Sequence, residues 1–366
     1  MSVVELFLEA VKVDSLSLRE RPMARFIHTT LSGLSVAVYE DDTAKTIKGD
    51  CGNLICIPSW FNPSHPAIAL FAHMDTPRTT VGVRPMLTDS RITSDGTTIL
   101  GVDNRAGSSV LLQVLKEHVS ANTQGNFIVV FTVAEEIGMF GSKHIDLTPY
   151  NIKMGFVFDC SKRPGVFIQS AVGCSLYDAT FIGRPAHAGV APEKGVSAIG
   201  IAATAVSQIP MGRLSPTMTS NIGMIVGGTA TNVVADRCTI HGEVREFIPA
   251  LIDEHLIMLK TTFERAAQSN GGDVEFGSRV DFPPFALGSD SEVFRTTVDV
   301  LQSVGLTPAP IQYLGGSDAN MLNEKGIPSV NFGIGAQNPH ANDEFILVED
   351  LHKSSEIATA LIARFP

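Results

Sequence analysis

The sequence predicts an α/β protein, a three-layer α/β/α sandwich into which a second α+β domain is inserted. Two observations lead to this prediction. Three short runs, 67–72, 127–133 and 154–158, are apolar almost throughout, which is typical of strands buried on both faces of a sheet. A segment with helical spacing of apolar residues, 106–118, separates the first two runs. Strand and helix therefore alternate along the chain, as they do in α/β sandwiches.

The remaining elements extend this pattern at both ends of the chain. Residues 1 to about 50 are expected to form one or two helices and then a strand at 35–38. After residue 285 the same texture returns, with a helix at 291–304, a strand at 327–332 and a terminal helix at 348–364.

The block between these parts has a different pattern. Its expected elements are a strand, a helix, two strands and a long helix, at 175–182, 195–208, 221–227, 238–246 and 251–270. This order favours a small antiparallel sheet with two helices on one side. We therefore predict a catalytic domain formed by 1–173 and 285–366, and an inserted domain at 174–284.

Composition limits the classes of function. The chain has 366 residues, of which 44% are hydrophobic, enough for two cores. A net charge of −11 gives no electrostatic reason to bind nucleic acid or an anionic membrane. No apolar run approaches the ~20 residues of a membrane span, and the acidic residues Glu5 and Glu9 favour a first helix over a signal peptide. The five cysteines include no Cys-x-x-Cys pair, so we expect no disulfide framework and a cytoplasmic location.

Five short segments carry ionisable residues of the metal-ligand type. Together they supply two histidines and five carboxylates, and they lie at 71–76, 101–107, 134–138, 158–160 and 338–340. Three of the segments follow apolar runs, and ligands of α/β sheets gather beyond the carboxyl ends of strands. This number of ligands suits two divalent ions, with one carboxylate left over as a base.

Taken alone, the first two segments have ordinary alternative explanations. His73 and Asp75 are two residues apart at a strand end, so both side chains point the same way and Asp75 could orient a metal-binding His73. The alternative is a surface histidine beside a turn aspartate. Asp103 could bridge two cations through its two oxygens, or it could simply cap the helix that follows.

The other three segments divide in the same way. Glu135 and Glu136 are adjacent and point in opposite directions, so one could bind metal while the other acts as general base. The alternative is a pair of glutamates on a solvated helix. Asp159 ends an apolar run and His340 lies in an irregular loop, and neither is distinctive alone. Cys160 is interpreted as a small buried residue.

As an ordered set, these segments resemble the dinuclear zinc exopeptidases that include peptidase T, glutamate carboxypeptidase, aminoacylase and succinyl-diaminopimelate desuccinylase. The resemblance spans nearly the whole chain. The segments 134–138, 315–318 and 332–345 most resemble the peptidase T branch. Asn104-Arg105 replaces a more usual Asp-Lys pair, and Cys160 stands where glycine is common. Neither change removes a ligand, but both leave the choice of substrate open.

The resemblance implies a role for each residue of the five segments. His73 and Asp159 would hold one metal, Glu136 and His340 would hold the other, and Asp103 would bridge them. Glu135 would be the general base and Asp75 would orient His73. The resemblance implies two zinc ions, and these ligand types also suit cobalt or manganese.

The resemblance also implies that the inserted domain is a lid or dimerisation domain. In the segment 183–192, His187 would reach the active site and stabilise the oxyanion, in relatives often from the partner subunit, so a homodimer is expected. The residues implied to bind substrate are Asn232, Arg245, Gly316 and Ser317. For Arg245 the alternative is a surface ion pair with Glu243 or Glu246.

Three functions remain open from the sequence. The first is an aminopeptidase or tripeptidase that hydrolyses short peptides, with water activated between two metals and Glu135 as base. The second is an amidohydrolase, deacylase or carboxypeptidase that acts on an N-acyl amino acid or dipeptide through the same site. The third is a catalytically inactive binding protein, which would lack a ligand or the base, and none is missing here. A single-metal enzyme is a variant of the first two.

Overall fold

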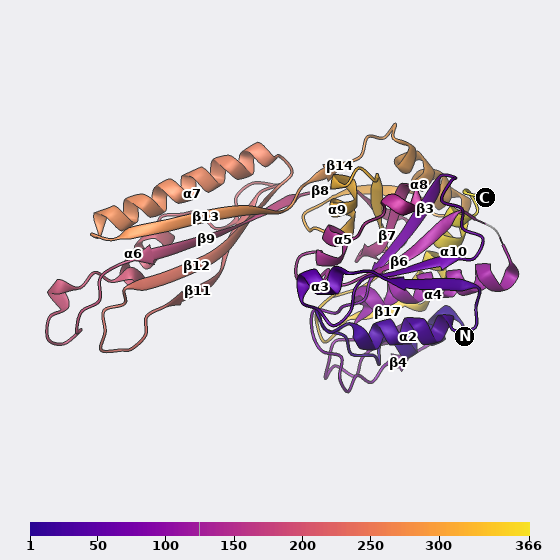
Figure 1. The fold of residues 1–366 in the computed structure, drawn as a ribbon, viewed down its shortest axis with the longest axis horizontal. Coiled ribbons are helices and arrows are strands. Elements are labelled where there is room, and N and C mark those ends of the chain that lie inside the picture. Colours follow the sequence, from indigo (N-terminus) through magenta and orange to yellow (C-terminus); the bar gives the residue numbers. More distant parts are fainter. Residues whose placement is uncertain (124) are drawn as a thin grey trace. The chain divides into compact units, whose positions relative to one another are not determined.

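The computed structural model describes residues 1–123 and 125–366, which form two compact units (Figure 1). The first unit comprises Met1–Ser170, Ala286–Tyr313 and Ser317–Pro366. The second comprises Ala171–Phe285 and Leu314–Gly316. Each unit has its own hydrophobic core.

A nine-stranded mixed sheet forms the centre of the first unit. In spatial order its path is β1 (Val36–Glu40), β2 (Leu54–Pro58), β6 (Phe127–Thr132), β3 (Ala67–His73), β7 (Ile152–Cys160), β16 (Ser329–Gly333), β8 (Val166–Ala171) and β14 (Phe285–Ala286), with β15 (Ala309–Tyr313) paired to β8. The four central strands β6, β3, β7 and β16 are parallel. Their carboxyl ends therefore meet at one edge of the sheet.

Helices cover both faces of this sheet, which confirms the predicted α/β class. On one face, Met154 and Phe156 of β7 join a core cluster with residues of α1 (Val3–Ala10), α2 (Arg21–Leu31), α4 (Val102–Ala121), α8 (Glu292–Ser303) and α10 (Val348–Ile362). On the other face, a Cβ added to Gly155, the residue between them, would meet Leu322 of α9 (Asp318–Glu324) at 3.3 Å. The short helices α3 (Thr43–Ile47) and α5 (Phe140–His144) pack in the same group as α9.

Smaller elements complete the first unit. A three-stranded sheet has the order β17 (Phe345–Leu347), β5 (Arg91–Thr93), β4 (Met86–Leu87). A 3-10 turn lies at Thr148–Tyr150. Among the described residues, no helix has both the length and the apolar character required to cross a membrane.

The second unit is a five-stranded antiparallel sheet with helices on one face. The strand order is β10 (Gly212–Arg213), β11 (Thr219–Gly227), β12 (Arg237–Glu246), β9 (Gly173–Ile182), β13 (Asp273–Phe282). Phe181, Ile240 and Val244 pack with Leu259 and Phe263 in a core cluster. These residues join the sheet to α7 (Pro249–Ser269), beside which lies α6 (Ala198–Val206). A 3-10 turn spans Pro192–Lys194.

Candidate metal centre

The predicted metal ligands of the first unit lie where the central strands end. His73 is the last residue of β3, Asp159 the last but one of β7, and Asp103 stands in the first turn of α4. Glu136 follows β6, and His340 lies in the loop after β16. Because β6, β3, β7 and β16 are neighbours in the sheet, side chains distant in sequence come together at this edge.

One group of ligand atoms surrounds the imidazole of His73. Its Nε2 lies 3.0 Å from Asp103 Oδ1 and 3.1 Å from Asp159 Oδ1. The side chain of His73 is only 1% exposed. Its other ring nitrogen, Nδ1, faces Asp75, with 3.3 Å to Oδ1 and 3.1 Å to the carbonyl oxygen. The ring is thus held from both sides by acidic residues.

A second group surrounds His340 and shares one member with the first. His340 Nε2 lies 3.3 Å from Asp103 Oδ2 and 3.4 Å from Glu136 Oε1. The two oxygens of Asp103 therefore face two different histidines. His340 is 48% exposed, in contrast to His73, whereas Glu136 is 8% exposed. Within each group, the candidate ligand atoms lie within 4.8 Å of one another.

The charged side chains within each group lie close enough to shift one another's pKa values. Burial lowers the pKa of His73, but the carboxylates of Asp159, Asp103 and Asp75 raise it well above its usual value. Hydrogen bonds with Asp103 and Glu136 raise the pKa of His340 to about 10. Burial and the charge of Asp103 raise the pKa of Asp159 to about 7. This much negative charge in a buried space favours the binding of cations.

The chemistry of these residues fits divalent metal ions. Each group offers one imidazole nitrogen and carboxylate oxygens, the ligands preferred by zinc and acceptable to cobalt or manganese. Within the described part of the chain, Glu136 Oε1 is buried and has a long contact of 3.4 Å with His340 Nε2 but no well-formed hydrogen bond, whereas a buried carboxylate oxygen normally has a closer partner. A cation between Glu136, Asp103 and His340 would supply one.

The side chain of Asp75 binds the backbone N–H groups of Glu135 and Glu136. Their N–H groups donate to the two oxygens of Asp75, each at 3.1 Å. The same carboxylate accepts a hydrogen bond from the hydroxyl of Ser17 at 2.6 Å. Burial raises the pKa of Glu135 well above its usual value, and the charge of His73 opposes the rise. Asp75 therefore contacts both His73 and the turn that carries the two glutamates.

The predicted substrate residues lie mostly in the second unit. His187 and Asn232 are exposed, and their segments pair, since Ala188 N donates to Asn232 O at 2.9 Å. Gly316 also belongs to the second unit, whereas Ser317 is the buried N-cap of α9 in the first.

The ion pair considered as an alternative role for Arg245 is present. Its guanidinium donates to both carboxylate oxygens of Glu243, at 2.9 and 3.0 Å. It also lies 5.8 Å from the centre of the Phe282 ring. Arg245 therefore already has a carboxylate partner within its own unit.

Two buried acids beside the site, Glu344 and Asp318, lie in segments that resemble the peptidase T branch, but the sequence predicted no role for either of them. Glu344 accepts hydrogen bonds from Gly101 N at 2.7 Å and Asp103 N at 3.3 Å, and so holds the loop that carries Asp103. Asp318 accepts from the hydroxyls of Thr132 and Ser142, both at 2.6 Å. Neither acid follows an apolar run in the sequence, so the signal that marked the other carboxylates was absent.

Comparison with known families identifies the class of protein. A family profile described as peptidase family M20/M25/M40 matches residues 69–364. The chain therefore belongs to this family of peptidases, as its motifs predicted.

Individual relatives narrow the assignment to a peptidase T-like branch. The chain is 35% identical to the Bacillus subtilis protein YqjE over 98% of this chain and 97% of that one. It is 26% identical to peptidase T of Exiguobacterium sibiricum over 75% of this chain and 67% of that one. Among solved structures, it is similar to the aminopeptidase PepT of Bacillus cereus (36% identity, TM-score 0.85, 98% of this chain and 97% of that one). It is also similar to a tripeptidase of Staphylococcus aureus (32% identity, TM-score 0.89, 98% and 96%).

Proposed function

We propose that this protein is a metal-dependent exopeptidase that hydrolyses short peptides, as an aminopeptidase or tripeptidase. Family membership supports a peptidase. The similar structures described as an aminopeptidase and a tripeptidase support the narrower activity. The observation that carries the proposal is Asp103, whose two oxygens face His73 and His340 at 3.0 and 3.3 Å.

Two divalent ions, zinc in our proposal and cobalt or manganese as substitutes, would be held by the two groups. His73 and Asp159 would hold one ion, Glu136 and His340 the other, and Asp103 would contact both. When bound, the ions would polarise the scissile carbonyl and make a water molecule more acidic.

The chain's own residues would manage the protons. Glu135 is the one carboxylate of the turn left outside both ligand groups, so we assign it as the base that removes a proton from the attacking water. The same carboxyl would then pass the proton to the leaving amine. Asp75 fixes the ring of His73 and the backbone of Glu135 together.

Most of the proposed substrate contacts come from the second unit, and Ser317 comes from the first. His187 would stabilise the oxyanion. Arg245 would bind the terminal carboxylate of the peptide, because a planar guanidinium binds a carboxylate through two parallel hydrogen bonds. Asn232, Gly316 and Ser317 would contact the peptide backbone.

We also propose that the second unit forms a homodimer. Its strand β11 lies near the edge of the sheet, paired on one side only along most of its length. Three consecutive apolar residues of this strand, Met224, Ile225 and Val226, are 56–60% exposed. An exposed apolar strand edge is a template for pairing with a second chain. The five cysteines are buried and form no disulfide among the described residues, which supports a cytoplasmic enzyme.

The test of the proposed function is a substrate panel with metal control. Activity against tripeptides, dipeptides and N-acyl amino acids is measured before chelation, after chelation, and after zinc, cobalt or manganese is added. We expect hydrolysis of short free peptides that disappears in chelator and returns with metal. Preference for N-acyl amino acids would instead identify a deacylase, and full activity in a verified metal-free sample would refute the metal mechanism.

A further inference from the structure

The turn that carries Glu135 and Glu136 is bound through four consecutive backbone N–H groups. Val133 N donates to Asn53 Oδ1 at 3.1 Å and Ala134 N donates to Glu20 Oε1 at 2.9 Å. The next two amides donate to the carboxylate of Asp75. All four acceptors are side chains, and they come from three distant segments. A turn fixed in this way has little freedom to move the side chains that it carries.

Glu20 binds two residues whose backbone is left-handed. Its Oε1 accepts from Ala134 N and also from Leu18 N at 2.8 Å. Ala134 has φ +52° and Leu18 has φ +69°. Residues with a Cβ rarely adopt this conformation and do so where the surroundings impose it. One buried oxygen therefore stabilises two unfavourable backbone positions, and one of them immediately precedes Glu135.

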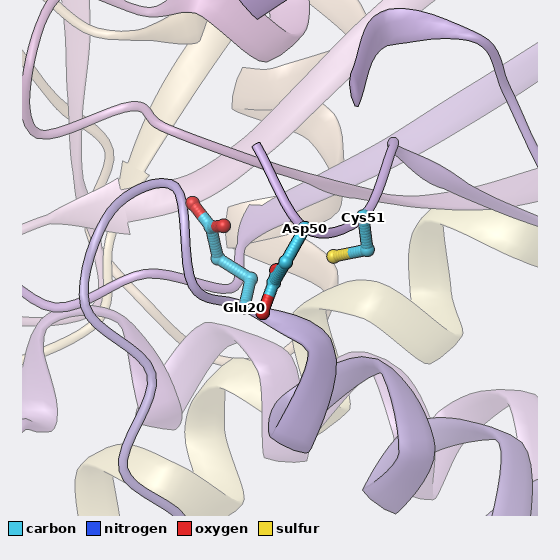
Figure 2. A group of neighbouring side chains, drawn as sticks. All are labelled: Glu20, Asp50 and Cys51. Atoms are coloured by element: carbon cyan, nitrogen blue, oxygen red, sulfur yellow. The ribbon is translucent and has the colours of Figure 1, made fainter. Parts of the chain in front are cut away.

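The second carboxylate oxygen of Glu20, Oε2, has different surroundings from Oε1. Figure 2 shows Glu20 on one segment and Asp50 and Cys51 on another. Single ligand-type atoms of the three lie within 4.8 Å of one another. Glu20 is fully buried, yet its Oε2 has no hydrogen-bond partner among the described residues. Among the described residues, the hydrogen bonds from Leu18 N and Ala134 N to the Glu20 side chain both end on Oε1.

We propose that Glu20 is a positioning residue, which holds Ala134 in its left-handed conformation and thereby sets the position of the Glu135 carboxylate. This inference rests on the proposed function, because it assumes that Glu135 is the base. Glu20 touches none of the reacting atoms. It acts through the backbone N–H of Ala134, which immediately precedes the two N–H groups that donate to Asp75.

The test compares three substitutions of Glu20 with one substitution of its neighbour Asp50. Glu20→Ala removes the acceptor, and Glu20→Asp keeps the charge but withdraws it by one methylene. Both should lower kcat about tenfold or more and change KM less than about threefold. A displaced base weakens stabilisation of the transition state but not binding of the substrate. Glu20→Gln keeps Oε1 and should recover most of the turnover. Asp50→Asn, the matched control, alters the cluster in Figure 2 without touching the turn and should leave kcat unchanged.

A second measurement does not depend on activity. Hydrogen–deuterium exchange of fragments covering residues 133–138 should be faster in Glu20→Ala and Glu20→Asp than in the wild type and Glu20→Gln, with metal content matched. Wild-type exchange in Glu20→Ala would overturn the proposal, as would equal loss of turnover in Asp50→Asn. If the wild type lacked peptidase activity, the proposed function would fail, and exchange would still decide whether Glu20 holds the turn.

Discussion

The two units of the chain hold their polar side chains differently. In the first unit, the candidate ligands stand at the ends of adjacent buried strands, and their contacting atoms are 3.0–3.4 Å apart. In the second, His187 and Asn232 are exposed. Arg245 lies on a sheet surface and is paired with Glu243. The first arrangement is complete within its own unit, whereas the second is not.

This difference separates binding of metal from recognition of substrate. A cluster fixed by a sheet and by buried carboxylates needs no further rearrangement to receive cations. Exposed side chains of the second unit acquire a role only when a substrate or another surface meets them. Loss of the metal ligands or the base of the first unit should therefore abolish the reaction, and changes in the second unit should lower its rate or weaken substrate binding.

The largest effect is expected from the two adjacent glutamates. Glu135→Gln removes the base and should lower kcat by ~10²–10⁴-fold, the usual contribution of general base catalysis, while both metals are retained. Glu136→Gln should instead lower metal content, because Glu136 Oε1 lies 3.4 Å from His340 Nε2 within a ligand group. Activity and metal content measured on the same samples separate the roles. Equal loss of metal in both variants would show that they are wrongly assigned.

A smaller effect is expected from His187. If it stabilises the oxyanion, His187→Ala should lower kcat by ~10²–10³-fold and change KM less. Its origin can be found by mixing His187→Ala subunits with Glu135→Gln subunits. If His187 acts on the partner's site, each mixed dimer contains one intact site and activity should return. Absence of rescue, with subunit exchange verified by mass, would place His187 in the same chain or outside the mechanism.

The sequence predicted the first unit well because burial and chemistry left a joint signal there. The apolar runs at 67–72, 127–133 and 154–158 correspond to β3, β6 and β7. Their ends carry His73, Glu135, Glu136 and Asp159, and the structure brings most of these into two groups. Helix α4 begins at Val102, four residues earlier than expected, but Asp103 and Asn104 have non-helical φ/ψ, so regular helix begins close to the predicted start.

Elements and residues without that joint signal were missed. Strand β13 is an edge strand whose side chains are mostly exposed, so it has no apolar run. Glu20 and Asn53 act through backbone amides of a distant turn, and nothing in their local sequence indicates the partner. For the second unit, the resemblance to a family supplied the functional residues, since the exposed positions of His187 and Asn232 give no pattern.

Arg245 should affect substrate binding and not the chemical step. A guanidinium that binds a carboxylate through two hydrogen bonds contributes more than an ammonium can. Charge-assisted bonds contribute about 1.5–3 kcal/mol, so Arg245→Lys should raise KM for a free tripeptide at least tenfold. The same peptide amidated at its C-terminus should be a poor substrate of both enzymes.

The matched control for Arg245 is Arg279→Lys, on the same sheet. Arg279 also pairs with an acid, Asp178, at 3.2 Å, and its change should leave KM unaltered. If the amidated peptide is cleaved as fast as the free acid, Arg245 does not bind the substrate carboxylate. Its role would then be the ion pair with Glu243 alone.

The last comparison concerns the stability of the fold, and it sets the wild type against Glu20→Gln. Burial and the charge of Asp75 raise the pKa of Glu20 from 4.5 to about 7. A carboxyl whose pKa is raised in the folded state stabilises the fold while protonated, below pH 4.5. This stabilisation is lost as pH rises from 4.5 through 7. Relative to Glu20→Gln, the wild type should therefore lose on the order of 3 kcal/mol across this range and nothing further above it.

The charged groups around Glu20 show which titration causes the difference in unfolding free energy between the wild type and Glu20→Gln. Asp75 carries the like charge that opposes ionisation, Asp50 and Cys51 lie beside the carboxyl, and Arg21 directs its guanidinium to Glu40 and to the carbonyl of Asp50. Urea unfolding at pH 5, 6, 7 and 8, at equal metal content, measures the gap between the variants. Burial raises the pKa of Asp75, but the hydrogen bond and charge of His73 lower it below its usual value, so Asp75 stays ionised from pH 5 to 8. A gap that stays constant with pH would mean that Glu20 keeps an ordinary pKa, with its charge compensated by a partner such as a cation beside Asp50 and Cys51.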